Sequence, residues 1–587
     1  MKLRKDIPEQ YKWDIGLFKT NEEIENALKT IEKLTSLAPN YYGKFSNPEV
    51  FFDYFYGHIN ETILVNQLYH YVGNMQSIDG ANIEIKKLLQ RIEILASKYE
   101  QAYSFVSPQM NKLSIKYLKS LLKDPRSKDI ENEIKSLIIS KKHSIDEKTS
   151  KVIADLSMSF NDSSSLFDIL SDMEIPFEDA TDTEGRTYPV REPMYKQYIS
   201  SKDRKLRETA FNSIMSGYGK FNQTLASLYI KDIKSDNDFV KLYKFNSKLE
   251  QKLFDYVPEV VFRNNIKFVE KNIPLLQDFV KTANKTSNLK DFAYYDLFED
   301  EKISGDISIE EGQKMILSAL TPLGNEYIEM VKNKFNDKSI DYLPNKDKTS
   351  GAYCSNCYKA KTLILTNWVN DYDSVSTLAH EMGHCINAEY FNNFQPYHKA
   401  EIPIFCAEIA STVNEILLNN YMQQTCKENE KAYFVKEFLN QVRSTIFRQT
   451  LFTEFELYAH ESVEKEIPIT HEELNKKYYD LNKKYYGESC VLPENLQYEW
   501  SRIPHFYRPY YVFTYSTGLL TAITIAQKLL SDKEYYKKYI HFLKNGSNKK
   551  PIEILKEIGI DLTKDKPFED AFKYISKQVS LYISLCK

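Results

Sequence analysis

Apolar residues recur every three or four positions along most of this chain. Two long examples are NEEIENALKTIEKLTSLA at 21–38 and KKLLQRIEILASKYEQAYSFV at 86–106. This spacing lines apolar side chains along one face of an α-helix. Only 17 Gly and 20 Pro are spread over the 587 residues, so few segments carry a residue that would break a helix. We therefore expect a mainly helical protein.

Strand-like segments are few and short. TYPV at 187–190 follows the turn TDTEGR, and KTLILTNW at 361–368 has the β-branched and apolar content of a short strand. The chain is too long for one small core, and its helical pattern breaks over 175–205. We therefore expect an N-terminal helical lobe at 1–195 and a second domain at 196–587.

Composition and charge argue against several classes of partner. The formal charge of −4 is close to neutral for this length, which gives no electrostatic reason to expect nucleic acid or an anionic membrane. No run of 18 apolar residues predicts a membrane span, and the basic start lacks the apolar segment of a secretory signal. Seven cysteines are odd in number and sparse, which is typical of free thiols in a reducing compartment. We expect a cytoplasmic protein.

The segment HEMGH at 380–384 has the spacing of a zinc site. With 10 His and 82 acidic residues, the pattern His-acid-x-x-His should arise by chance only about 0.02 times. Two imidazoles one helical turn apart can bind the same zinc, and Glu381 can take a proton from a water on that metal. The alternative is a solvated helix face on which His380 and His384 are incidental.

The residues around this segment predict that it lies on an amphipathic helix. Asp373 or Ser374 can cap the helix at its N-terminus. Apolar residues then follow at helical spacing on one stripe: Val375, Leu378, Ala379, Met382, Cys385 and Ile386. The two histidines fall on the roughly opposite side, where they need a partner.

A catalytic zinc usually has three protein ligands, so a third must be found. The extended pattern H-E-x-x-H-x-x-G-x-x-H requires Gly and His at positions where the chain has Asn387 and Tyr390, so that class is rejected. Glu408 on the next predicted helix is the expected third ligand, and Glu415, two turns later, is expected to orient a ligand histidine. His398 in the intervening loop is a weaker alternative.

A second polar cluster lies in RIPHFYRPYYVFTYSTG at 502–518. Tyr507, Tyr511 and Tyr515 are spaced four apart, so in a helix they would form one stripe with His505 at its start. Hydroxyl and imidazole donors can stabilise the oxyanion of a tetrahedral intermediate, each by roughly 3 kcal/mol. The alternative is an aromatic core stripe, which is common in a chain with 43 Tyr.

The chain resembles the oligoendopeptidase F branch of the thimet-oligopeptidase-like zinc metallopeptidases, nearly from end to end. The segments that carry the resemblance are YKWDI at 11–15, PFEDATDTEG at 176–185, SKDRKLRETAFNSI at 201–214, SGAYCSNCYKAKTLILTNW at 350–368, TLAHEMGH at 377–384, FCAEIASTVNEILL at 405–418 and RIPHFYRPYYVFTYSTG at 502–518. Together these segments are far more specific than the pentapeptide alone.

This resemblance implies a two-lobed, mainly α-helical bowl that encloses a deep substrate channel, with a small β-sheet beside the zinc-binding helix. It implies hydrolysis of internal bonds in short unstructured oligopeptides, with one zinc per chain. The implied roles are zinc ligands His380, His384 and Glu408, base Glu381, supporting acid Glu415, and substrate-side donors His505 and Tyr511, then Tyr507. Members often carry a further histidine three residues past the second ligand, where this chain has Asn387.

Two alternatives keep part of this interpretation. The zinc enzyme could instead be an exopeptidase or a protein-cleaving protease, although no amine-binding acid motif is evident, which weighs against an aminopeptidase. A non-catalytic peptide-binding helical scaffold would not need the intact Glu381. The nearby pair Cys354 and Cys357 is expected to be two free thiols, since a single C-x-x-C without a second pair is weak evidence for redox or metal chemistry.

Overall fold

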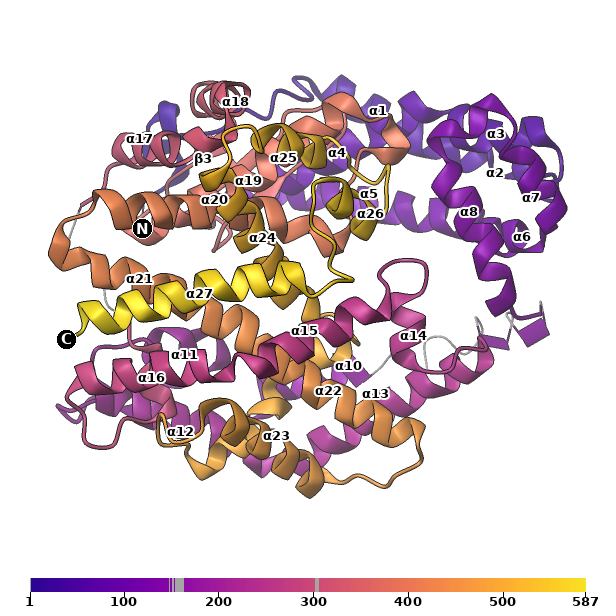
Figure 1. The fold of residues 1–587 in the computed structure, drawn as a ribbon. Helices are drawn as coiled ribbons and strands as arrows, with labels where there is room; N and C mark the ends of the chain where they lie inside the picture. The colour runs from indigo at the N-terminus through magenta and orange to yellow at the C-terminus, as the bar shows by residue number, and fades with distance from the viewer. Residues whose placement is uncertain (1, 147, 150–151, 154–162, 301–305) are drawn as a thin grey trace. The chain divides into compact units, whose positions relative to one another are not determined.

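The structure, a computed structural model, describes residues 2–146, 148–149, 152–153, 163–300 and 306–587 (Figure 1). Helices make up most of the described chain, and its short strands form two small sheets. The predicted mainly helical class is therefore confirmed. No described helix combines the length and the apolar character that crossing a membrane requires.

The chain divides into two compact units, each built from three stretches. The first unit contains Met1–Ser144, Gly305–Tyr421 and Ile525–Gly559, and the second contains Ile145–Ser304, Met422–Thr524 and Ile560–Lys587. The domain boundary expected between residues 195 and 196 stays a prediction, and the compact units divide the chain differently.

The first unit holds the N-terminal helices and the helices on either side of the HEMGH segment. Its helices are α1 (Asn21–Ser36), α2 (Ala38–Tyr41), α3 (Pro48–Tyr56), α4 (Ile59–Ile78), α5 (Ile83–Tyr103), α6 (Val106–Lys112), α7 (Ile115–Leu121), α8 (Glu131–Ser140), α17 (Ile309–Ala319), α18 (Asn325–Asn336), α19 (Tyr372–Phe394), most of α20 (Ile404–Thr425), α25 (Tyr536–Leu543) and α26 (Pro551–Glu557).

The second unit holds a further set of α-helices. They are α10 (Ser163–Ile169), α11 (Glu192–Ile199), α12 (Arg204–Lys220), α13 (Asn222–Leu242), α14 (Lys248–Leu253), α15 (Glu259–Lys271), α16 (Ile273–Ser287), α21 (Lys431–Gln441), α22 (Arg448–Glu464), α23 (His471–Tyr486), most of α24 (Phe513–Ser531) and α27 (Lys566–Leu585). Strands β1 (Ala180–Thr181) and β2 (Thr187–Tyr188) pair antiparallel in this unit, where TYPV predicts a strand.

Helix α1 shows how the sequence pattern produces these elements. The Thr20 hydroxyl accepts a hydrogen bond from the Glu23 N–H, and the Glu23 carboxylate accepts one from the Thr20 N–H, which closes a capping box. Apolar residues spaced three and four apart then bury one face: Ala27, Leu28, Ile31 and Leu34. The periodicity of the segment 21–38 therefore predicts both the helix and its buried face.

A three-stranded sheet lies beside α19 in the first unit. Its order is β3 (Ile340–Asp341), β5 (Leu363–Leu365), β4 (Tyr353–Ser355), with β5 parallel to β3 and antiparallel to β4. The central strand β5 is fully buried, as the apolar segment KTLILTNW predicts. Strands β4 and β5 both contact α19, so the sheet supports the helix that carries the histidine pair.

Candidate metal centre

Helix α19 carries His380 and His384, and its opposite, apolar face is buried in the first unit. The predicted apolar stripe is buried, with Val375, Leu378 and Met382 completely inaccessible. The predicted cap is wrong, because the side chain that accepts from the Ser374 N–H at 2.9 Å is that of Asp371. The helix therefore begins one turn earlier than its apolar periodicity suggests.

Helix α20 crosses α19 at very close range, and Gly383 makes this possible. A Cβ atom at position 383 would lie 2.5 Å from the Ser411 Cα and 2.6 Å from the Ala410 carbonyl oxygen. Beside the crossing, the Asn414 amide donates to the Ala379 carbonyl oxygen at 3.0 Å. The crossing brings the acidic face of α20 against the histidine face of α19.

Three of the predicted ligand atoms lie at the corners of a nearly equilateral triangle. The His380 Nε2 and His384 Nε2 atoms are 3.2 Å apart, and the Glu408 Oε2 atom lies 3.4 and 3.5 Å from them. Zinc bonds of about 2.0–2.1 Å in a regular tetrahedron would separate neighbouring ligand atoms by roughly 3.3–3.4 Å. The donor set therefore fits one zinc ion, and it is the single His/Cys/Asp/Glu group of this kind among the described residues.

Glu415 lies behind this triangle. Its carboxylate accepts a hydrogen bond from the Nδ1 atom of His380, so Nε2 is the nitrogen of this ring that can bind a metal once it has lost its proton. Burial lowers the pKa of His380, but Glu408 and Glu415 outweigh burial and raise it to about 10. The alternative ligand His398 lies elsewhere, with its Nε2 atom 2.9 Å from the Phe55 carbonyl oxygen.

Glu381 lies in a pocket of about 320 Å³ that the three candidate ligands also line. Its side chain is almost buried, and burial raises its pKa, although His380 and His384 lower it in part. A carboxylate with a raised pKa beside a cation site has the properties of a general base. Cys354 on β4 lines the same pocket, and Cys354 and Cys357 are free thiols, as expected.

The second unit contains the predicted oxyanion donors, but they do not form a helical stripe. That prediction is wrong, because Tyr507 ends the short helix η12 (Pro504–Tyr507), Tyr511 lies between elements, and Tyr515 alone is in α24. The Tyr511 ring centroid lies 6.4 Å from that of His505 and 5.2 Å from that of Tyr515. Tyr507 instead packs 4.9 Å from Phe167.

Proline residues and the backbone conformation of Tyr510 explain why residues 507–515 do not form one helix. Pro504 and Pro509 interrupt the segment, and Tyr510 has a left-handed φ of 54° that a helix does not contain. The Glu456 carboxylate accepts from the Tyr510 N–H at 2.7 Å and so holds this turn. Four-residue spacing alone could not reveal the turn, although the two prolines are a signal for it.

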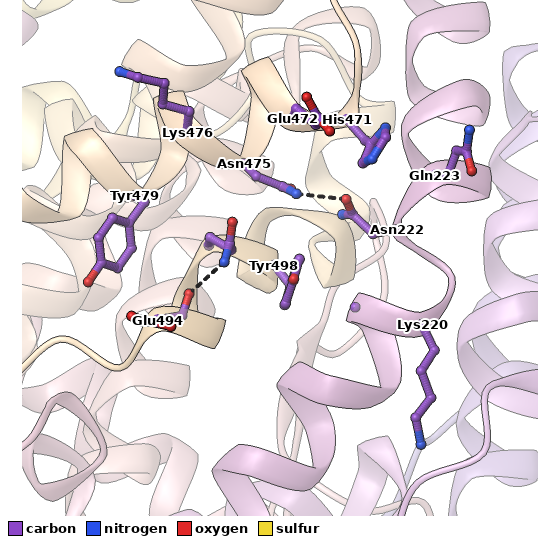
Figure 2. A pocket seen from close by; sticks show the side chains of 12 residues that line it. Lys220, Asn222, Gln223, His471, Glu472, Asn475, Lys476, Tyr479, Glu494 and Tyr498 are labelled. Carbon is purple, nitrogen blue, oxygen red and sulfur yellow. Dashed lines mark hydrogen bonds between the residues drawn. The ribbon is translucent and has the colours of Figure 1, made fainter.

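A larger cavity than the Glu381 pocket lies in the second unit and contains none of these residues. It has a volume of about 670 Å³, and its walls carry charges of both signs, among them Lys220, Lys476 and Glu494 (Figure 2). In one wall, the Asn475 side-chain amide donates to Oδ1 of Asn222 at 2.9 Å (Figure 2). Volume alone therefore does not identify the functional site of this protein.

Comparison with known proteins gives one consistent family. The profile of Peptidase family M3 matches residues 197–574. Oligopeptidase PepF of Bacillus subtilis is 30% identical over 98% of this chain and 87% of its own length, and an oligoendopeptidase F homolog of Borreliella burgdorferi is 30% identical over 97% of both. The crystal structure of oligoendopeptidase-F from Enterococcus faecium is similar with a TM-score of 0.73 at 28% identity, covering 96% of this chain and 99% of that one.

The close crossing of the helices generates a test. Gly383→Ala should force α19 and α20 apart and weaken the affinity for added zinc by at least about 10-fold, because the ligand triangle depends on the crossing. Affinity is measured by competition with a chelator.

Gly518→Ala is the matched control, since a Cβ atom on this α24 glycine would meet nothing within 4 Å. It should bind zinc like the wild type. Native zinc affinity in the Gly383 variant would show that the crossing does not set the ligand spacing.

Proposed function

The chain belongs to Peptidase family M3 and is a metalloendopeptidase, and we propose that it is a zinc enzyme that hydrolyses internal bonds of short, unstructured oligopeptides. The observation that carries this proposal is the triangle of His380, His384 and Glu408 with Glu381 in the same pocket. The names of the relatives, oligopeptidase and oligoendopeptidase, support the substrate class.

One zinc per chain is proposed, held by His380, His384 and Glu408. When bound there, zinc would supply a Lewis acid that polarises the scissile carbonyl and lowers the pKa of water towards about 7. Three protein ligands leave a fourth position open, which is the arrangement of catalytic rather than structural zinc sites.

Glu381 is the proposed general base. Its carboxylate accepts a proton from the water that attacks the peptide carbonyl carbon, and it can pass this proton to the leaving amine nitrogen. Burial raises the pKa of Glu381, which makes the carboxylate a better proton acceptor. It can still release the proton to the leaving amine, which is the stronger base. Glu415 keeps the His380 ring in one orientation through the Nδ1 hydrogen bond.

His505 and Tyr511 are the proposed donors to the developing oxyanion. Their rings pack in parallel, and burial lowers the pKa of His505, so this ring stays neutral at neutral pH and can donate from one nitrogen. Tyr507 is a weaker candidate, because it packs against Phe167 and burial strongly raises its pKa. Tyr515 packs against both proposed donors.

The remaining parts of the proposal concern partners and location. Oligopeptides are the proposed partners, with neither nucleic acid nor membrane, supported by the near-neutral charge. A cytoplasmic location is proposed because none of the seven cysteines, all of which lie within the described residues, is in a disulfide.

The reaction itself is tested with an internally quenched peptide. Cleavage should be lost on treatment with a chelator and restored by zinc, and Glu381→Gln should lower kcat by roughly 10²–10⁴-fold while keeping the zinc, because an amide cannot accept the proton. Mass spectrometry of the products separates internal from terminal cleavage.

A Glu381→Gln enzyme with near-native kcat would remove this residue as the base. Products that differ by single terminal residues would favour an exopeptidase, and a wild type that binds peptide without cleaving it would favour the non-catalytic scaffold.

Glu408 and Glu415 should differ in what they contribute to the metal. Glu408→Ala should weaken zinc affinity more than Glu415→Ala, because loss of a ligand costs more than loss of a partner that orients one, which typically costs 10–100-fold. Both affinities are measured by chelator competition at one pH. If the Glu408 variant binds zinc like the wild type, the third ligand must be sought elsewhere.

Tyr511 and Tyr507 should also differ in how much their hydroxyl groups contribute to kcat. Tyr511→Phe should lower kcat by roughly 10–1,000-fold with native zinc content and little change in KM, because it removes one hydroxyl donor from the transition state. Tyr507→Phe is the matched control and should keep kcat within about 3-fold, since its ring contacts remain. A native kcat in the Tyr511 variant would return this residue to a packing role.

A further inference from the structure

Strand β4 lies at the edge of the three-stranded sheet, and the backbone N–H and C=O of its middle residue, Cys354, point away from the sheet. In β5, Ile364 and Thr366 donate their N–H groups to β3, so positions 363 and 365 face β4. The register pairs those positions with Ser355 and Tyr353. The N–H and C=O of Cys354, between them, therefore point away from β5 to the free edge of the sheet.

This free edge faces Glu381. Cys354 and Glu381 line one pocket, β4 contacts the helix α19 that carries Glu381, and the outward-pointing Cys354 N–H lies beside the Glu381 carboxylate. This N–H is fixed to the backbone of β4, so a lateral shift of the strand would move it relative to the carboxylate. The position of β4 therefore sets the polar surroundings of Glu381.

Four side chains connect β4 to helix α4, and we call them the Asn74 network: His70, Asn74, Tyr353 and Ser355. The Tyr353 hydroxyl donates to Asn74 Oδ1 at 3.0 Å, and Asn74 Nδ2 donates to Ser355 Oγ at 3.0 Å and to the His70 carbonyl oxygen at 2.6 Å. The Ser355 hydroxyl lies 3.0 Å from His70 Nδ1. Asn74 thus holds the two residues that flank Cys354.

The directions of these hydrogen bonds require an amide at position 74. The Asn74 oxygen accepts from Tyr353, and both N–H bonds of its nitrogen are used. The Ser355 hydroxyl, having accepted from Asn74, is free to donate to His70 Nδ1. Asn74 is only 2% exposed, so a carboxylate of the same shape could not replace the lost donors with water.

We propose that Asn74 is a positioning residue for catalysis, which holds β4 so that the Cys354 N–H orients Glu381. The inference rests on the proposed role of Glu381 as the base. Asn74 lies on helix α4 (Ile59–Ile78), outside the residues that the family profile matches. Part of the catalytic arrangement would therefore lie in the N-terminal part of the chain.

The test is Asn74→Asp, which keeps the shape and removes both donors. We expect kcat to fall about 10-fold or more with KM within about 3-fold and with native zinc content, because the metal ligands lie on α19 and α20. Hydrogen exchange followed by mass spectrometry should show faster exchange over 350–360 and unchanged exchange over α19.

Matched controls separate this effect from the general loss of a hydrogen bond. Asn132→Asp removes an amide that donates to the Ser547 and Asn548 carbonyl oxygens, also in the first unit, and should leave kcat and β4 exchange native. Tyr353→Phe should reproduce a smaller form of the Asn74 effect. Tyr117→Phe, which loses a comparable bond to the Phe45 carbonyl oxygen, should not.

Three outcomes would overturn the proposal: native exchange over β4 in the Asn74 variant, faster exchange with native kcat, or loss of zinc together with activity. If Asn74→Asp does not fold, Tyr353→Phe and Ser355→Ala carry the same comparison. If the wild type itself cleaves no peptide, the proposed function fails, and the Asn74 proposal falls with it; the exchange data would still decide whether the network holds β4.

Discussion

The proposed metal centre depends on one steric fact, the backbone contact between α19 and α20 at Gly383. Two histidines on one helix supply two ligand atoms, and a third must come from another segment at 3.4–3.5 Å. Only a residue without a Cβ atom lets the Ala410 and Ser411 backbone come close enough for Glu408 to reach both rings. The same crossing places Glu415 behind His380, so one contact positions both the proposed ligands and the acid that hydrogen-bonds to one of them.

Polar contacts within the first unit keep this crossing in register. Asn414 links α20 to the Ala379 carbonyl oxygen, and its own oxygen accepts from the Tyr327 hydroxyl of α18 at 3.1 Å. These groups are buried, so an unpaired partner would cost free energy, and the paired arrangement is favoured over a shifted one. The three-stranded sheet also helps to fix the position of α19, because β4 and β5 both contact this helix.

Local patterns in the sequence predict the parts that are encoded locally. The helical class, the buried stripe of α19 and the strand at Leu363–Leu365 follow from periodicity and composition. Strands β3 and β4 are too short to show a pattern, and they exist because β5 pairs with both. At Tyr507–Tyr515 the reverse occurs: the sequence has a helical pattern but no continuous helix forms. Four-residue spacing arises by chance in a tyrosine-rich chain, and two prolines interrupt this segment.

The catalytic arrangement therefore combines information at two scales. A short motif specifies which atoms can bind a metal and take a proton, but it does not fix their positions to a fraction of an ångström. That precision comes from contacts between residues far apart in the chain, such as Gly383 with Ser411 and Asn74 with Ser355. Since Asn74 lies on α4, outside the matched family segment, the HEMGH motif alone does not specify how firmly β4 is held beside the proposed base.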